Sequence, residues 1–510
     1  MKKIIKLSIL AILLFSYVSC EKGLDELNQN KTSPTALDPV LLLNSAIINA
    51  SFPTRSLIFD IGVVQQMITP NGGVLAGANF NQDSRDASGI WGSYYQGVIK
   101  NTHDAIVTTK ALPARSNLYH MSRILQAYAF MILTDEFGDI PYSEGGAGYS
   151  NQVFFPKYDA QQAIYTDLIK ELTEAGTALN ASGTIESADV LYAGNITKWK
   201  KFANALLLRA GMRLSKVDAA KAQSTVLAAF TAGVIIDNAD NAYMRHDANY
   251  TQPIGSQQNG SEAANFYLTK PFVDQLKNTN DPRLSAIAIR YVGATSGNGQ
   301  TVATGNTTPG VQIGMPMGKD NGTIVPQATA DGLASFYDYS QADRRRILKP
   351  SSPVFYVTAS QTLLLLAEAK QRNWITAGTV SQYYTDGIKA NMDQMASFDP
   401  GSAISVSARD AYILANPLNA GTELEQINVQ YWITSFLNGP EAFANFRRTG
   451  FPILTPNPYG QPSNPDVPNG TFIRRLTYPT SELSVNSKNV QDAISRQGAD
   501  KLSTKIWWDK

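Results

Sequence analysis

Apolar residues recur every three or four positions over long stretches of the chain, and this spacing constrains the fold strongly. Such a period places the apolar side chains on one face of an α-helix. The pattern predicts helices over residues 117–134, 159–179, 197–214, 360–370, 381–392 and 423–437. Short connections between several of these helices predict a core of helix pairs, although the tetratricopeptide sequence pattern itself is not matched.

Two long stretches interrupt the helical pattern. Residues 69–88 and 294–334 are rich in Gly, Asn and Thr and poor in large apolar side chains. Long loops in compact domains are often binding loops, so these two are candidates. Strand patterns are few and short, as at residues 233–237 and 310–313. No linker or charge run divides residues 20–510, so we expect one mostly α-helical unit with long loop elaborations and a few short strands.

The N-terminus has the pattern of a secretory leader. Three lysines accompany the start of the chain, and residues 7–18 are then almost entirely apolar. This run is too short to cross a bilayer as a helix, which takes about 20 residues, so residues 1–19 are predicted to be a signal peptide. Cys20, the only cysteine, directly follows Ser19. This arrangement predicts a lipobox, with lipidation of the Cys20 sulfur, and residues 20–30 suit a short polar tether.

Charge and motifs argue against several classes of function. The chain carries a net charge of +1, and without the three leader lysines 40 basic residues face 42 acidic ones. No basic block is present, so nucleic acid is not expected as a ligand. His103, His120 and His246 lack the spacing of a zinc site, and the Gly-rich runs lack the Gly-Lys-Ser/Thr of a phosphate loop. With no GxSxG motif either, we predict no catalytic residue, metal or cofactor.

Residues 133–144, LTDEFGDIPYSE, gather the carboxylates of Asp135, Glu136, Asp139 and Glu144. A left-handed Gly138 followed by a proline is typical of a helix end. The carboxylates then lie at the helix C-terminus, where the macrodipole disfavours each one by about 0.3–1 kcal/mol. A compensating partner is therefore needed.

Two arginines are the expected partners of these carboxylates. Arg209 and Arg213 lie one turn apart on the helix predicted over residues 197–214, and we expect them to pair with Asp135 and Asp139. The alternative is a glycosidase pair, which needs two carboxyl groups about 5–5.5 or 6.5–9.5 Å apart beside a sugar cleft. The helix-end pattern favours the structural role.

Nine separated motifs, in order, resemble one family. They are ILTDEFGDIPYSE (132–144), KYDAQQAIYTDLIKEL (157–172), KWKKFANALLLRAGMRL (198–214), DPRL (281–284), LLLAEAKQRNW (364–374), YYTDGIKANM (383–392), FRRTGFP (446–452), RRLTYPTSE (474–482) and KIWWD (505–509). Behind a lipoprotein signal, they resemble the SusD/RagB-type outer-membrane lipoproteins, and specifically the SusD-like branch.

The resemblance implies both a fold and a function. It implies a right-handed core of tetratricopeptide-like helix pairs with loop-rich elaborations. It also implies a lipid-anchored protein on the outer face of the outer membrane that captures an oligosaccharide, without catalysis, for a SusC-type TonB-dependent transporter. Peptide capture, as in RagB-like relatives, remains an alternative, and so does a helical-repeat scaffold for surface complexes.

Aromatic residues in or beside the two loops are the candidates for contact with a sugar. A sugar ring presents an apolar C–H face, which a flat aromatic side chain with a polar rim can cover. The candidate residues are Asn79, Phe80, Arg85, Trp91, Tyr94, Tyr337 and Tyr339. For Trp91 a core role is equally open, because Trp91, Tyr94 or Tyr95, and Val98 have the spacing of a buried helix face.

Overall fold

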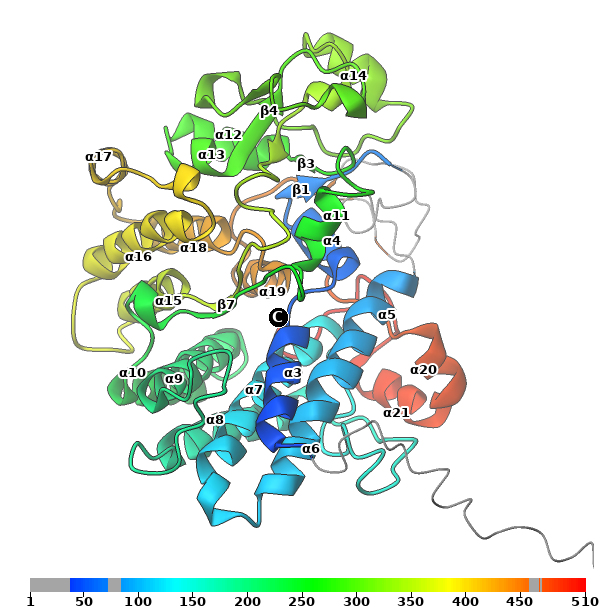
Figure 1. The fold of residues 1–510 in the computed structure, drawn as a ribbon, viewed down its shortest axis with the longest axis vertical. Helices are drawn as coiled ribbons and strands as arrows, with labels where there is room; N and C mark the ends of the chain where they lie inside the picture. Colours follow the sequence, from blue (N-terminus) through cyan, green and yellow to red (C-terminus); the bar gives the residue numbers. More distant parts are fainter. Residues whose placement is uncertain (1–36, 72–83, 458–466, 468–469) are drawn as a thin grey trace, which may run out of the picture.

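The computed structural model describes residues 37–71, 84–457, 467 and 470–510. The predicted signal peptide, Cys20 and the tether lie outside these ranges. Helices dominate the described chain and strands are short (Figure 1). The expectation of a mostly α-helical fold is therefore confirmed.

One group of helices occupies the lower half of the view in Figure 1. Its members are α3 (Pro39–Asn49), α6 (Lys100–Thr109), α7 (Ser116–Phe137), α8 (Gln161–Ala178), α9 (Ile196–Arg213) and α10 (Ala219–Ala232). Consecutive helices pack on one another from α6 to α10. Their apolar faces are the predicted ones, since Leu118, Met121 and Leu125 of α7 are fully buried. The predicted core of helix pairs is present here.

A second group lies above the first, in the middle of the molecule. It comprises α4 (Thr54–Val63), α15 (Ala359–Gln371), α16 (Val380–Gln394), α17 (Val406–Ala415), α18 (Glu423–Thr434) and α19 (Gly439–Thr449). Helix α15 packs on α16 and α18, and it also contacts α9 of the lower group. A single continuous set of buried apolar side chains runs through both groups.

The remaining elements surround these two groups. The upper part holds α11 (Pro253–Gln258), α12 (Lys270–Asn278), α13 (Arg283–Ile287) and α14 (Ile324–Ala330). To the right in Figure 1 lie α5 (Ser84–Gly92), which continues into the π-helix η2 (Ser93–Ile99), and α20 (Thr480–Val485) with α21 (Ser487–Gln497). Short 3-10 turns include η6 (Gly297–Gly299), η7 (Pro309–Val311) and η8 (Phe336–Asp338).

Short antiparallel strands connect distant parts of the chain. The pairs are β1 (Met67–Ile68) with β3 (Tyr267–Leu268), and β2 (Ala242–Met244) with β7 (Val354–Val357). A three-stranded sheet has β4 (Ala288–Tyr291) between β5 (Gly305–Asn306) and β6 (Gln341–Ala342). The strands expected at residues 233–237 and 310–313 are wrong. The first is an irregular segment after α10, and the second begins within η7.

Helix α7 ends as its sequence predicts. It stops at Phe137, and Gly138 follows with φ of +81°, a conformation that favours glycine. The helix predicted over residues 159–179 begins later than expected, at Gln161. Asp159 does not cap α8 and instead accepts hydrogen bonds from the backbone of Tyr142 and Ser143. The first amide of α8, that of Gln161, donates to the carboxylate of Asp139 at 2.9 Å.

The predicted pairing of arginines with carboxylates is half correct. Arg213 Nε lies 3.1 Å from Asp135 Oδ2, as expected. Arg209 instead pairs with Glu441 of α19 at 3.1 Å, and Arg213 reaches the same carboxylate at 2.6 Å. Asp139 pairs with Arg496 of α21 at 3.0 Å.

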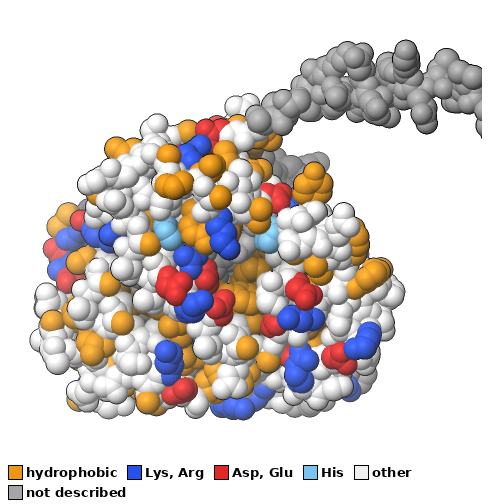
Figure 2. Space-filling view, turned by 90° about the horizontal axis from the view of Figure 1, so that it is seen from below, with side chains coloured by type: hydrophobic (Ala, Val, Ile, Leu, Met, Phe, Trp, Pro, Cys, Tyr) orange, Lys and Arg blue, Asp and Glu red, His pale blue; other side chains and the backbone are white. Residues whose placement is uncertain are grey.

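Charges on the surface are mixed. Seen from below, small groups of Lys and Arg side chains lie beside Asp and Glu side chains, among apolar and uncharged ones (Figure 2). This face therefore offers no continuous basic area. Within the described ranges, no helix combines the length and apolarity needed to span a membrane.

Candidate functional site

The acidic segment at residues 133–144 is part of the architecture. Asp135 is buried and accepts hydrogen bonds from Tyr165 Oη at 2.5 Å and Trp508 Nε1 at 2.8 Å, in addition to its ion pair. Glu136 is also fully buried, and burial raises its pKa to about 8. Neither carboxylate faces an open cleft, so the structure gives Asp135 and Glu136 a structural role.

The sequence-predicted ligand residues near the first loop have different surroundings. Asn79 and Phe80 lie outside the described residues. Arg85 belongs to α5, but its side chain lies outside the described part of the structure. Tyr94 is fully buried and its hydroxyl donates to the Ala50 carbonyl at 2.9 Å, as a core residue does. Trp91 is 7% exposed and lies at the edge of a cavity.

Trp91 is the centre of an aromatic cluster. Its ring centroid lies 4.8 Å from that of Tyr95 and 5.0 Å from that of Phe137. Tyr158 and Tyr478 complete the cluster at 6.1 and 6.2 Å. Trp91 is therefore mostly packed in the core and also borders a cavity.

The cavity beside Trp91 has a volume of about 430 Å³. We call it the Trp91 pocket. Its walls come from the end of α5 with the start of η2, from residues 141–156, and from the start of α20. Tyr95 is half-buried in it and donates its hydroxyl to the Pro141 carbonyl at 2.7 Å. The pocket is large enough for a sugar residue.

The two tyrosines after the second loop also differ. Tyr339 is fully buried, and its hydroxyl donates to Asp331 at 2.5 Å. Tyr337 is half-buried and stacks on Phe336, with ring centroids 4.1 Å apart and an interplanar angle of 29°. We call this pair the 336–337 platform. It is the part of the second loop region that offers aromatic surface to a ligand.

The second loop is more ordered than its composition predicts. It contains η6, β5, η7 and α14. Met315, Ile324 and Tyr339 join a small apolar cluster of their own, separate from the main core. Ser335 Oγ donates to the Ala294 carbonyl at 2.7 Å, so the two ends of the loop are tied together.

The Trp91 pocket and the 336–337 platform are different places on the molecule. Residues 336–338 pack against β4 and α14. Figure 1 shows β4 and α14 at the top, whereas α5 lies lower on the right. The structure therefore does not bring Trp91 and Tyr337 into one site.

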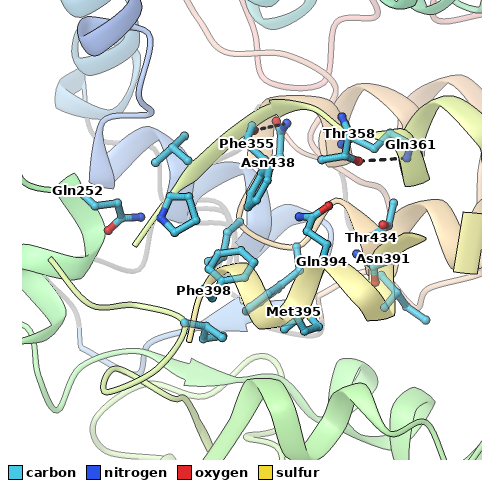
Figure 3. A pocket seen from close by; sticks show the side chains of 16 residues that line it. Gln252, Phe355, Thr358, Gln361, Asn391, Gln394, Met395, Phe398, Thr434 and Asn438 are labelled. Carbon is cyan, nitrogen blue, oxygen red and sulfur yellow. Dashed lines mark hydrogen bonds between the residues drawn. The ribbon is translucent and has the colours of Figure 1, made fainter. Parts of the chain in front are cut away.

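Another cavity lies between α15, α16 and α18 (Figure 3). Amide side chains line it, among them Gln361, Gln394 and Asn438, and Asn438 donates to the Phe355 carbonyl at 3.2 Å. Its volume of about 30 Å³ is room for about two water molecules. It is too small for a sugar.

Sequence reasoning missed several residues around the Trp91 pocket. The sequence pattern places Glu144 only at the helix end and does not indicate Glu482 as a ligand residue, yet both line the pocket. Phe154 and Phe155, 70% and 61% exposed, lie beside Val153 and Pro156 of its wall. Two consecutive phenylalanines in a segment without helical or strand period were the available signal. Across the described residues, no group of three or more His, Cys, Asp or Glu could hold a metal ion.

Comparison with known proteins gives a consistent result. A SusD-like family model, described as starch-binding and associating with the outer membrane, matches residues 29–479. A chitin-binding protein of known structure is 32% identical, with a TM-score of 0.81, over 92% of this chain and 100% of that one. A Bacteroidetes AC2a SusD-like protein is 25% identical, with a TM-score of 0.79, over 93% and 100% of the two chains.

A further similar structure is a chitin-binding SusD homolog from Flavobacterium johnsoniae. It is 25% identical, with a TM-score of 0.74, over 92% of this chain and 98% of that one. No curated protein sequence is significantly similar to the chain.

Proposed function

This chain belongs to the SusD-like family, and on that premise we propose that it is a cell-surface receptor that binds an oligosaccharide without catalysis. The observation that carries the proposal is its likeness, over almost the whole chain, to two proteins described as chitin-binding. The first ligand to test is therefore an oligomer of N-acetylglucosamine. The bound oligomer would then pass to a SusC-type TonB-dependent transporter.

The 336–337 platform is the proposed contact surface for the sugar. Its partly exposed rings can stack on the apolar face of a pyranose. The platform is held rigidly, since Gln300 Nε2 donates to the Tyr337 carbonyl at 2.9 Å and Arg290 Nε donates to Asp338 at 2.9 Å. Rigid support reduces the entropy that binding would cost. Asn79 and Phe80 of the first loop, and Arg85 of α5, are proposed as further contacts.

The expected affinity is modest. An aromatic contact adds about 0.5–1.5 kcal/mol beyond area burial, so two or three such contacts correspond to micromolar-to-millimolar binding. Weak binding suits a protein that must release its ligand to a transporter. Lipidation of Cys20 would hold the protein at the outer membrane, facing the exterior.

Calorimetry with N-acetylglucosamine oligomers on the detergent-extracted native protein tests the proposal. We expect Tyr337→Ala to weaken binding about tenfold, which corresponds to about 1.4 kcal/mol. Tyr250→Ala is the matched control, because Tyr250 is a tyrosine 54% exposed elsewhere on the surface. Unchanged affinity in Tyr337→Ala would reject the platform as the site, and binding of peptides but of no glycan would favour the RagB-like alternative.

The membrane and transporter parts of the proposal need separate measurements. Mass spectrometry of the native protein should show acyl chains on Cys20 and no residues before it. Gentle extraction of the outer membrane should recover a TonB-dependent transporter with the protein. A receptor that never associates with such a transporter would instead support the scaffold alternative.

A further inference from the structure

The Trp91 pocket has a chemistry that differs from that of the 336–337 platform. Two carboxylates line it, Glu144 from the turn after α7 and Glu482 from α20, whereas no Lys or Arg is among its lining residues. Two negative charges in one partly enclosed cavity repel each other, and a bound cation relieves that repulsion. The pocket is therefore suited to a positively charged group.

Neither carboxylate is neutralised by a close ion pair in the described structure. Glu482 Oε2 accepts a neutral hydrogen bond from Tyr158 Oη at 2.8 Å. Glu144 Oε2 accepts from the Lys157 backbone amide at 2.9 Å. The ammonium of Lys157 is 3.9 Å from Glu144 Oε1 and its side chain is 58% exposed, so this pair is weak. Among the described residues, the only ion pair that either carboxylate makes is this long one between Glu144 and Lys157.

Aromatic side chains surround the same cavity. Trp91 and Tyr95 form part of its wall, with ring centroids 4.8 Å apart. Burial raises the pKa of the Tyr95 hydroxyl, and the charge of Glu482 raises it further. Phe154 and Phe155, which are largely exposed, lie in the chain between the lining residues Val153 and Pro156. Such rings can cover a sugar face and also attract a cation.

We propose that the Trp91 pocket binds a glycan unit that carries a free amine, such as a glucosamine residue of a partly deacetylated chain. The ammonium would lie between Glu144 and Glu482, and the pyranose ring would contact Tyr95 and Trp91. A metal ion is a poorer occupant, since no three-ligand group exists among the described residues. The pocket is separate from the 336–337 platform, so this inference does not depend on the proposed N-acetylglucosamine site.

The test compares two probes by calorimetry with the native lipoprotein in detergent. They are a glucosamine tetramer and its fully N-acetylated counterpart. We expect Glu482→Gln to weaken binding of the glucosamine tetramer at least about tenfold, or about 1.4 kcal/mol, and to leave the acetylated tetramer unaffected. Glutamine keeps an oxygen that can accept the Tyr158 hydroxyl, so the fold should be preserved.

Glu144→Gln provides a second variant, at the other carboxylate of the pocket, and it should also weaken binding of the glucosamine tetramer. Glu174→Gln, an exposed carboxylate on α8, is the matched control and should change neither affinity. The proposal is overturned if the parent protein does not bind the glucosamine tetramer, or if both pocket variants bind it as tightly as the parent. Equal loss of both probes in the pocket variants would also overturn it, because amine recognition requires a difference between them.

Discussion

Replacement of Arg213 with alanine should destabilise the protein without changing its affinity for glycans. Arg213 is 1% exposed and donates to two buried carboxylates, to Asp135 at 3.1 Å and to Glu441 at 2.6 Å. Its removal leaves these negative charges in the interior with fewer partners. Arg209 still pairs with Glu441, and Tyr165 still donates to Asp135, so each carboxylate keeps at least one of its partners.

The size of the effect follows from these contacts. Removal of one partner from a buried ion pair typically costs about 3–5 kcal/mol, and the surviving donors place Arg213→Ala near the lower end. Unfolding entropy of about 2.1 cal/mol/K per residue, over 510 residues, amounts to about 1 kcal/mol per degree. If the chain unfolds as one unit, Tm should therefore fall by about 3 °C.

Differential scanning calorimetry at neutral pH, with glycan titrations beside it, measures both quantities. Lys488→Ala is the control, because the Lys488–Asp492 pair spans 3.0 Å but the lysine is 85% exposed, and such surface pairs contribute little. Asp135→Asn added to Arg213→Ala should recover part of the lost stability, since it removes an unpaired charge. A Tm in Arg213→Ala equal to that of the parent would refute the reasoning.

Three further substitutions probe the interior by melting temperature. Gly138→Ala should cost about 1–2 kcal/mol, because alanine disfavours a positive φ and its Cβ would collide with the Gln497 side chain; an unchanged Tm would contradict this. Despite burial, Arg448 lowers the pKa of Glu368 to about 2. The ionised Glu368 therefore stabilises the fold fully above the ordinary glutamate pKa, and this stabilisation is lost as pH falls. The Tm deficit of Glu368→Gln should thus shrink below about pH 4.5. For Glu136, burial raises the pKa to about 8, so ionisation of the unfolded state penalises folding increasingly from about pH 4.5 to 8. Glu136→Gln should therefore gain stability relative to the parent between pH 5 and 8, and a constant difference would contradict the assignment.

Local patterns in the sequence were sufficient to predict the helices and one of the buried ion pairs, that of Arg213 with Asp135. The apolar stripe and Gly138 predicted α7, whose end and buried face the structure confirms. The partner of Arg209 could not be predicted, because Glu441 lies more than two hundred residues away and no local rule links them. Asp159 shows a related limit, since an aspartate before a helix can cap it or bond to a neighbouring turn, and only the tertiary contact selects between these roles.

The ambiguity between Tyr94 and Tyr95 has a structural cause. Residues 93–99 form a π-helix, whose turn is wider than that of an α-helix. A spacing rule based on 3.6 residues per turn cannot be extended through such a segment. Tyr94 consequently enters the core, while Tyr95 contacts Trp91 and borders the pocket. A sequence pattern that treats both tyrosines alike cannot distinguish the buried ring from the half-buried one.

The order of residues 294–334 likewise depends on partners outside the segment. Its few large apolar residues would not form a core alone, which is why its composition predicts a loop. The missing surface comes from Ile68 of β1 and Tyr267 of β3, which pack with Met315 and Ile324 in one cluster. Strands β1 and β3 also pair with each other. The chain just before the first loop and the ordered second loop therefore pack against the same small apolar cluster. Changes within the loop can therefore alter the 336–337 platform while the main core, to which these cluster residues do not belong, stays intact.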